Sequence, residues 1–249
     1  PYTVADATFE RLVTLAAQLN IPIHCHVHET CYEVDESRRL HGLTPLARLK
    51  RLGLLGPGFI GVHCVHLADE DLELLAATGC SVAHCPTSNL KLASGIAPVA
   101  RMRQLGINVG LGTDGAASNN RLDMFGEMRL AALLAKGSSG DATTLPAREA
   151  LRMATLDGAT ALGLGNEIGS ITPGKAADLV AVNLKGLNTK PCYDPLSHLV
   201  YVADRECVTH VWIAGKCCVD HKRVVGNGGN DLESAIALWQ NRLEVRREG

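Results

Sequence analysis

Ile21-Pro22-Ile23-His24-Cys25-His26-Val27-His28-Glu29-Thr30 is a short apolar run in which three histidines stand at alternate positions and a carboxylate follows. If residues 21–28 form a strand, the three histidines lie on one face, because side chains alternate across a strand. Neutral imidazole is a common ligand for zinc-like metals. A strand whose histidines bond backbone carbonyls is the structural alternative, but three rings followed by Glu29 favour a metal or acid–base site.

The composition is that of an ordinary globular protein. The chain has 249 residues, of which 46% are hydrophobic and 20% charged, with a net charge of −2. This length allows one large domain or two small ones, and the charge gives no sign of a nucleic-acid or anionic-membrane partner. No apolar run approaches the roughly 20 residues of a membrane span, and no secretory signal opens the chain.

Cysteine usage favours a reducing compartment. The nine cysteines are scattered and form no CxxC pair, which suits reduced thiols better than a disulfide framework. We therefore expect a cytoplasmic protein whose partner is a small molecule, with no nucleic acid and no membrane. Homo-oligomerisation stays open.

Strands and helices alternate four times between residues 6 and 114. The expected strands cover residues 21–28, 59–66, 80–86 and 107–114, and the expected helices cover residues 6–19, 44–55, 69–78 and 96–105. These strands are too apolar to face water on either side, so we predict a parallel sheet covered by helices.

Each expected strand carries a reactive residue at its C-terminal end: His26 to Glu29, His63, His84 and Asp114. A (β/α)8 barrel builds its active site on that face, whereas a doubly wound sheet usually binds ligands at one switch point. The sequence therefore predicts an α/β fold that is the C-terminal half of a barrel. Half a barrel cannot close, so the remaining strands are expected upstream of Pro1.

Two further helices are expected over residues 122–136 and 146–162. After them the pattern changes from alternating strands and helices to short strands. Short strands are expected over residues 177–184, 207–214, 216–219 and 223–225, separated by Gly or Pro turns. A flexible break over residues 226–230 precedes a helix that aligns Leu232, Ile236, Trp239 and Leu243. We divide the chain into a partial barrel over residues 1–165, a partial β domain over residues 166–225, and a linker with a C-terminal helix over residues 226–249.

Two glycine-rich runs imitate nucleotide-binding motifs. Residues 110–115 match GxGxxG, but a loop follows instead of a helix, and no acidic residue stands about 20 positions on. Residues 169–176 nearly match a phosphate-binding loop, but no Ser or Thr follows Lys175 and a strand is expected next. We expect neither run to bind a nucleotide phosphate.

The residues that remain form a chemically coherent set: His26, Glu29, His63 and Asp114. His26 and Asp114 can ligate one divalent metal ion that makes a water molecule acidic. Asp114 can also take that water's proton, His63 can hold the resulting hydroxide, and Glu29 can protonate a substrate nitrogen. Two ligands are fewer than the three of a catalytic zinc site, so further ligands are expected upstream.

Five linked motifs carry a family resemblance. They are His26-Val27-His28-Glu29-Thr30, His63-Cys64-Val65-His66-Leu67, His84-Cys85-Pro86-Thr87-Ser88-Asn89-Leu90-Lys91-Leu92, Leu111-Gly112-Thr113-Asp114-Gly115-Ala116-Ala117-Ser118-Asn119-Asn120 and Gly169-Ser170-Ile171-Thr172-Pro173-Gly174-Lys175-Ala176-Ala177-Asp178-Leu179. From Pro1 to about Val225 the sequence resembles the amidohydrolase superfamily. Within it the sequence is most similar to the S-adenosylhomocysteine/5′-methylthioadenosine deaminases and their triazine-hydrolase relatives.

The resemblance implies a (β/α)8 barrel with a composite β-sandwich, of which this chain would supply barrel strands 5–8. It implies that His26 and Asp114 bind the metal and that Glu29 and Asp114 contact the substrate. The implied catalytic residues are Glu29, His63 and Asp114, with His63 bonding the nucleophile.

The resemblance gives the other histidines no such role. We interpret His24 and His28 as packing or supporting residues, and His66 and His84 as structural or substrate-loop residues. Ser88 and Asn89 are left unassigned.

The implied activity is hydrolytic deamination of an adenosine-type thioether nucleoside at purine C6, with release of ammonia. Zinc is the favoured metal, with iron or manganese as alternatives. Triazine or guanine hydrolysis and a non-catalytic fragment are the alternative functions.

The family's first-strand H-x-H pair is absent from this chain. We therefore expect residues 1–249 alone to lack a complete metal site and to pack loosely, with Val180, Val182, Val211 and Ile213 partly uncovered.

Overall fold

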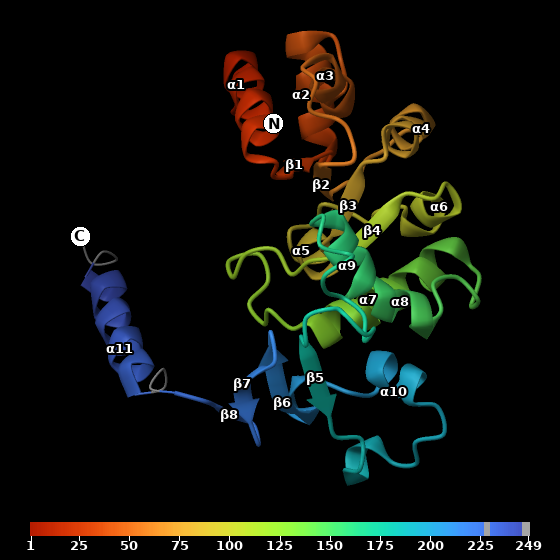
Figure 1. Ribbon diagram of the computed structural model, residues 1–249. Helices are drawn as coiled ribbons and strands as arrows, with labels where there is room; N and C mark the ends of the chain where they lie inside the picture. The colour runs from red at the N-terminus through yellow and green to blue at the C-terminus, as the bar shows by residue number, and fades with distance from the viewer. Residues whose placement is uncertain (227–229, 246–249) are drawn as a thin grey trace.

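Two four-stranded sheets organise the molecule in a computed structural model, which describes residues 1–226 and 230–245 (Figure 1). The first sheet is parallel and its order follows the chain: β1 (Ile23–Val27), β2 (Phe59–His63), β3 (Ser81–His84) and β4 (Asn108–Leu111). The second is antiparallel: β5 (Leu179–Val182), β6 (Val208–Ile213), β7 (Lys216–Asp220) and β8 (Arg223–Val224). The chain is thus of the mixed α/β class, as the sequence predicted.

Three parallel strands end earlier than their apolar runs suggest. β1 ends at Val27, β2 ends at His63, and β4 ends three residues before Asp114. The backbone is left-handed at or beyond these ends, with φ of 56° at His28, 73° at His63 and, three residues after β4, 59° at Asp114. Such angles cannot continue a strand. The pairing from Ile23↔Phe59 to Val27↔His63 still brings the strand ends side by side.

Helices flank both sheets. Their bounds are α1 (Asp6–Leu19), α2 (Cys31–His41), α3 (Pro45–Arg51), α4 (Asp69–Thr78), α5 (Pro86–Lys91), α6 (Val99–Gln104), α7 (Met124–Ser139), α8 (Ala147–Met153), α9 (Leu156–Ala161), α10 (Pro195–Tyr201) and α11 (Asn230–Val245), with 3₁₀ turns η1 (Leu187–Thr189) and η2 (Arg205–Cys207). The predicted bounds of α1 and α4 are confirmed. The predicted helix over residues 146–162 is wrong as one element, since Thr155 (φ −131°, ψ −94°) separates α8 from α9.

The sequence did not predict α2, α5 or α10. Polar and charged residues dominate α2, which buries only Glu33 and Val34, so it has no clear apolar stripe. Its start is nevertheless a regular cap, because the Thr30 hydroxyl accepts a hydrogen bond from the Glu33 backbone N–H. The N-caps Thr44 of α3 and Asp123 of α7 accept backbone N–H groups in the same way.

The two glycine-rich runs have structural roles. A Cβ atom on Gly110 would lie 2.9 Å from the Cα of Gly158, so glycine lets α9 pack directly on β4. Lys175 donates hydrogen bonds to the carbonyl oxygens of Gly165 and Ile168. Its ammonium group therefore closes a turn, and the absence of phosphate binding at the two runs stays a prediction.

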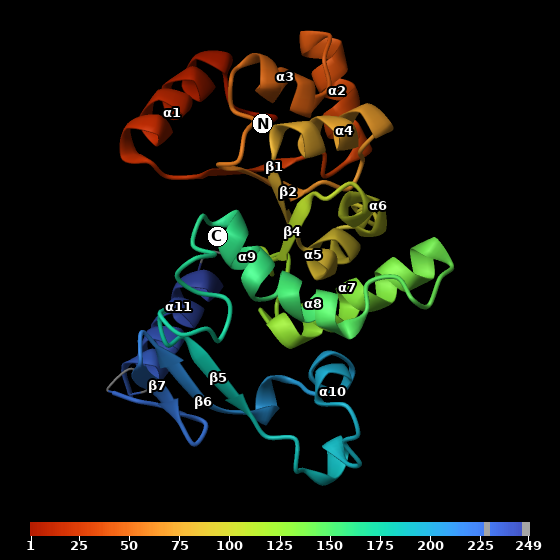
Figure 2. The same ribbon diagram turned by 45° about the vertical axis from the view of Figure 1, so that its right-hand side comes forward.

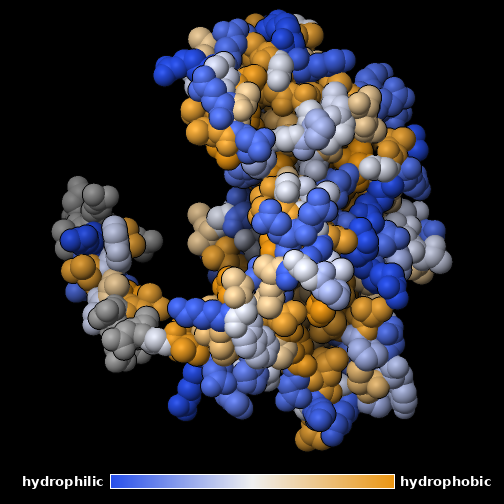
Figure 3. Space-filling model, in the orientation of Figure 1, coloured by the Kyte–Doolittle hydropathy of each residue, from blue (hydrophilic) through white to orange (hydrophobic). Residues whose placement is uncertain are grey.

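The second sheet and the C-terminal helix leave apolar side chains in solvent. Val180 and Ile213 are 57% and 56% exposed. The stripe Leu232, Ile236, Trp239 and Leu243 of α11 is exposed as well, and apolar side chains of this helix lie at the surface in Figure 3. The predicted break over residues 226–230 falls mostly outside the described residues. Within the described ranges, no helix is both long and apolar enough to cross a membrane.

Candidate active site

Three predicted site residues meet at the C-terminal ends of the parallel strands. One ligand atom each from His26, His63 and Asp114 lies within 4.8 Å of the other two. The rings of His26 and His63 meet edge to face, with centroids 4.8 Å apart. Partial desolvation, together with the neighbouring His63, lowers the pKa of His26, which favours the neutral ring that can bind a cation.

Backbone strain is concentrated at the site. The positive φ angles of His28, His63 and Asp114 are uncommon for residues other than glycine and cost on the order of 1–3 kcal/mol each. Strain of this kind persists where the surrounding structure fixes it, often at functional sites. No sequence pattern indicated it.

His28 turns away from the other two histidines of the opening stretch. His24 and His26 are exposed on one face of β1, but His28 is fully buried. Its Nδ1 donates to the carbonyl of His66 at 2.7 Å, and its Nε2 accepts the Leu46 backbone N–H at 3.2 Å. The prediction that all three rings share one face is therefore wrong for His28, because the strand ends at Val27. Its ring has no nitrogen left for a ligand, which agrees with a packing role.

His63 is oriented by Asn89. Its Nδ1 lies 2.8 Å from the Asn89 side-chain oxygen and donates to it. The buried Nε2 finds no hydrogen-bond partner among the described residues, and Glu29 Oε2 lies 3.7 Å away. The sequence reasoning assigned no role to Asn89. It also did not expect His63 to lie as close to His26 and Asp114 as a metal ligand would.

Asp114 is held as a carboxylate. Its Oδ2 accepts hydrogen bonds from Ser88 Oγ at 2.7 Å and Ser118 Oγ at 2.6 Å. Partial burial raises the pKa of Asp114, but the bonds from Ser118, Ser88 and the Gly115 backbone outweigh it and lower that pKa to about 2. The charge is therefore available to a cation throughout the physiological range.

Glu29 is positioned by residues that the sequence analysis missed. Tyr2 Oη donates to Glu29 Oε2 at 3.1 Å, and Ser94 Oγ donates to Oε1 at 3.2 Å. The Glu29 backbone N–H donates to the buried Glu33 carboxylate at 2.7 Å. A signal for Glu33 existed, since Thr30 and Glu33 have the spacing of a capping box.

His66 and His84 lie outside the three-residue cluster. His66 Nε2 donates to the Ser94 carbonyl at 2.7 Å and thereby supports the loop that holds Ser94 against Glu29. Burial, and to a lesser extent His63, lowers the pKa of His84 to about 4. Its Nδ1 finds no partner in the described part of the chain.

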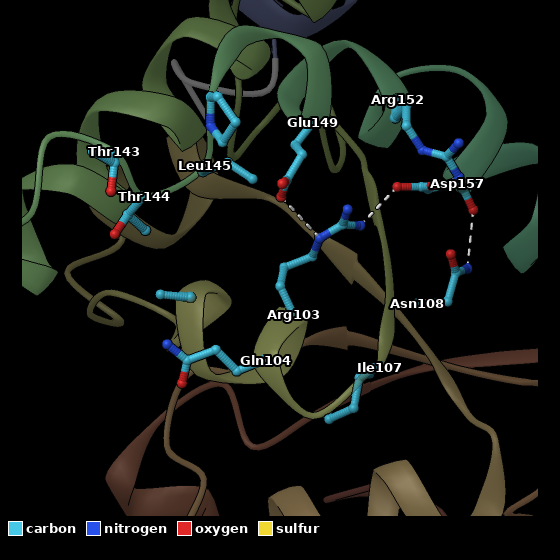
Figure 4. Close-up of a pocket in the computed structure, with 13 residues that line it drawn as sticks. Arg103, Gln104, Ile107, Asn108, Thr143, Thr144, Leu145, Glu149, Arg152 and Asp157 are labelled. Carbon is cyan, nitrogen blue, oxygen red and sulfur yellow. Dashed lines mark hydrogen bonds and ion pairs between the residues drawn. The ribbon is translucent and has the colours of Figure 1, made fainter.

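A separate hollow of about 540 Å³ lies at the other end of β4 (Figure 4). Its charged groups pair with one another: Arg103 contacts Asp157 at 2.7 Å and Glu149 at 3.5 Å, and Arg152 contacts Asp157 at 2.8 Å. Since these charges are mutually neutralised, they indicate a packing network.

The donor set at the strand ends suits a zinc-like cation. Two imidazole nitrogens and one carboxylate oxygen are typical of three-ligand sites that keep an open position. The buried Nε2 of His63, which has no partner in the described part of the chain, fits such a group, because an unsatisfied buried acceptor is costly unless a proton donor or a cation meets it.

Comparison with known proteins establishes the family. Residues 1–218 match the Amidohydrolase family, which is most of the chain. The chain belongs to this family.

Individual relatives extend the comparison. A 5-methylthioadenosine/S-adenosylhomocysteine deaminase from Teredinibacter turnerae is 44% identical over 99% of this chain and 56% of its own length. An adenosine deaminase from Xanthomonas campestris, solved with bound zinc, has a TM-score of 0.96 at 49% identity and covers 98% of this chain and 56% of its own. An atrazine chlorohydrolase from Arthrobacter aurescens, complexed with zinc, has a TM-score of 0.86 at 31% identity. The match covers 94% of this chain and 51% of that protein. The chain thus spans about half the length of the relatives it matches.

Proposed function

We propose that this chain carries part of the active site of a metal-dependent hydrolase that deaminates adenosine-type thioether nucleosides such as S-adenosylhomocysteine and 5′-methylthioadenosine. The observation that carries the proposal is the convergence of His26, His63 and Asp114 within 4.8 Å at the strand ends. The deaminase names of similar relatives support this substrate class.

The proposal includes the architecture that such an enzyme needs. β1 to β4 correspond to strands 5–8 of a (β/α)8 barrel over residues 1–165, and β5 to β8 belong to a β-sandwich over residues 166–225. An active site at the C-terminal strand ends is the rule in such barrels.

His26 and Asp114 would hold one divalent metal ion, with zinc favoured because two zinc-bound structures are similar to this chain. When bound, the metal would supply a Lewis acid that makes water acidic near neutral pH. His63 has its Nε2 free to bind either the metal or the attacking water. This chain therefore offers two to three protein ligands.

Glu29 is the proposed proton donor to the substrate ring. Its carboxylate is 13% exposed and is oriented by Tyr2 and Ser94 on its two oxygens. A protonated Glu29 can give its proton to the ring nitrogen while Asp114 takes one from the attacking water. Asp114 then returns that proton to the amino group, which leaves as ammonia, and Glu29 recovers a proton from the new C6 hydroxyl, so the hydrolysis balances.

The test is ammonia release by the full-length gene product that contains these residues. S-adenosylhomocysteine, 5′-methylthioadenosine, adenosine, guanine and atrazine are assayed side by side under the same conditions. We expect the thioether nucleosides to have the highest kcat/KM. Turnover of none of the purines would contradict the proposal.

Triazine hydrolysis is the second candidate, since the atrazine chlorohydrolase has a similar fold at 31% identity. Chloride release is measured on the same samples, and dechlorination of atrazine without deamination of any nucleoside would favour this second candidate.

A further inference from the structure

A second group of metal-binding side chains lies on the antiparallel sheet. In the described part of the chain, His210, Asp220 and His221 each offer a ligand atom within 4.8 Å of the other two. His210 belongs to β6, Asp220 ends β7, and His221 begins the turn to β8. Figure 2 shows β6 and β7 side by side in this sheet. This sheet is separate from the one that carries the candidate active site.

The turn that presents His221 is unusual. β7 and β8 pair at Asp220↔Arg223, which leaves a two-residue loop, His221-Lys222. Both loop residues have positive φ, 45° and 69°, as a type I′ turn requires. Asn and Gly normally occupy such positions, so His221 is held here at a conformational cost. The Lys222 backbone N–H donates to the Thr209 carbonyl at 2.9 Å and fastens the turn against β6.

Hydrogen bonding determines which nitrogen of His210 is free. The Thr209 hydroxyl donates to the Ala181 carbonyl at 3.2 Å, so toward the His210 Nδ1 at 3.0 Å it acts as the acceptor. Nδ1 therefore carries the proton, and the neutral ring has its lone pair on Nε2. The ring of Trp212 stacks on His210 at an interplanar angle of 7° and limits its rotation.

The free nitrogen of His210 faces a carboxylate. Nε2 lies 3.1 Å from Asp220 Oδ1, and His221 Nδ1 donates a hydrogen bond to the same oxygen at 2.7 Å. The lone pairs of His210 Nε2 and Asp220 Oδ1 repel at this distance unless a proton or a metal cation lies between them. In a tetrahedral site with metal–ligand distances near 2.1 Å, ligand atoms are about 3.4 Å apart. The His210–Asp220 pair is already close to that separation, and the exposed ring of His221 can turn to complete the site.

We propose that His210, Asp220 and His221 form a second metal site, which binds a divalent ion of the zinc, nickel and copper group. Two imidazoles and one carboxylate suit these ions, whereas calcium and magnesium prefer all-oxygen sites. The side chains of His210, Asp220 and His221 are 24%, 58% and 83% exposed, so water can fill the remaining coordination positions.

Trp212 provides a local reporter for the test. The chain has two tryptophans, so Trp239→Phe leaves Trp212 as the single fluorophore beside the proposed site. The probe is Ni²⁺ added to the full chain after chelator treatment, in an Asp114→Asn background that removes a ligand of the first cluster. We expect saturable quenching of Trp212 with one equivalent of nickel.

The decisive variants keep the hairpin intact. His221→Asn removes a ligand but suits the positive φ of the turn, and Asp220→Asn keeps the side-chain volume. Loss of a group that only hydrogen-bonds a metal ligand typically lowers metal affinity about 10- to 100-fold. Loss of a ligand itself should therefore weaken nickel binding by at least about tenfold in each variant. Cys217 is the cross-strand partner of Trp212, so Cys217→Ser is the control for thiol binding and should leave quenching unchanged.

Thermal unfolding is measured for every variant, and His221→Asn should be at least as stable as its parent. Absence of saturable quenching in the parent, or equal nickel affinity in His221→Asn and Asp220→Asn, would overturn the proposal. Loss of quenching in Cys217→Ser would also overturn it, since nickel would then be bound by a thiol.

Discussion

At His63, the position of a single proton decides what the side chain can do. Donation from Nδ1 to Asn89 leaves Nε2 as a buried acceptor beside His26 and Asp114. His28 shows the opposite case, because backbone groups engage both of its ring nitrogens. Among the described residues, the hydrogen-bond partners of these two histidines therefore leave one ring with an available acceptor and the other with none.

The ligand assignment predicts a contrast between two neighbouring histidines. His26→Ala and Asp114→Asn should each lower bound zinc and abolish deamination in the full-length gene product, because each removes a ligand. His24→Ala is the matched control, since His24 is exposed on the same face of β1 but outside the cluster. Metal content by mass spectrometry and ammonia release are the measurements. Stoichiometric zinc in His26→Ala would refute the assignment.

Glu29 should act on protons and not on metal. Glu29→Gln is expected to keep zinc yet lose about 10²-fold or more in kcat, the usual contribution of a general acid. Glu73→Gln, at an exposed position of α4, is the control and should keep the parent rate. Loss of zinc in Glu29→Gln would instead identify Glu29 as a ligand.

Buried His84 should make stability depend on pH. The pKa of His84 in the folded chain is lowered to about 4, against 6.5 when unfolded. Below pH 6.5 the unfolded chain binds a proton that the folded chain refuses, so stability falls as pH drops from 6.5 toward 4. Between pH 7 and 5, His84 contributes a loss on the order of 2 kcal/mol. Urea unfolding at both values should show a smaller pH effect in His84→Asn, and an equal effect would contradict this assignment.

At the scale of elements, close packing of helix on strand depends on residues without side chains. α9 approaches β4 where Gly110 faces Gly158. The Arg103, Arg152 and Asp157 network ties α6, α8 and α9 together at the same end of the strand (Figure 4). The helices that cover the parallel sheet are thus held by a close glycine contact and by ion pairs, in addition to the burial of apolar side chains.

Gly110→Ala should destabilise the chain by about 1–3 kcal/mol, the usual cost of overpacking, because the new methyl group would lie 2.9 Å from the Gly158 Cα. Gly56→Ala is the control, since its Cβ meets nothing within 4 Å. Chemical denaturation measures both. Equal midpoints for the two variants would show that α9 can shift without cost.

At the scale of the whole molecule, the first metal cluster joins separate strands. His26, His63 and Asp114 come from three different strand ends, so an ion bound there links β1, β2 and the segment after β4. Binding to the folded state alone stabilises it by mass action.

Zinc at 100 times its dissociation constant should therefore raise the free energy of unfolding by roughly 3 kcal/mol. The experiment uses a His221→Asn background, which removes the proposed surface site. Calorimetry with zinc and with excess chelator gives the difference in Tm. In His26→Ala with Asp114→Asn the difference should vanish; a persistent zinc effect would place the stabilising ion elsewhere.

The sequence by itself determined the parallel β-strands, the bounds of α1 and α4, the second small sheet and the residues that meet at the strand ends. Apolar runs and helical periodicity depend only on residues that are neighbours in the sequence. Parallel pairing then places the C-terminal ends of the strands at the same edge of the sheet. The family also followed from short motifs within these segments.

Only the tertiary structure decided the direction of His28, the free nitrogen of His63 and the roles of Tyr2, Glu33, Asn89 and Ser94 around the site. Each depends on a positive φ or on a partner distant in sequence, such as Leu46 for His28 and Asn89 for His63. The His210, Asp220 and His221 cluster has the same origin, since antiparallel pairing and a strained turn bring its members together. Sequence patterns contain the periodicity of strands and helices. The orientation of a side chain depends on groups that come next to it only when the chain folds.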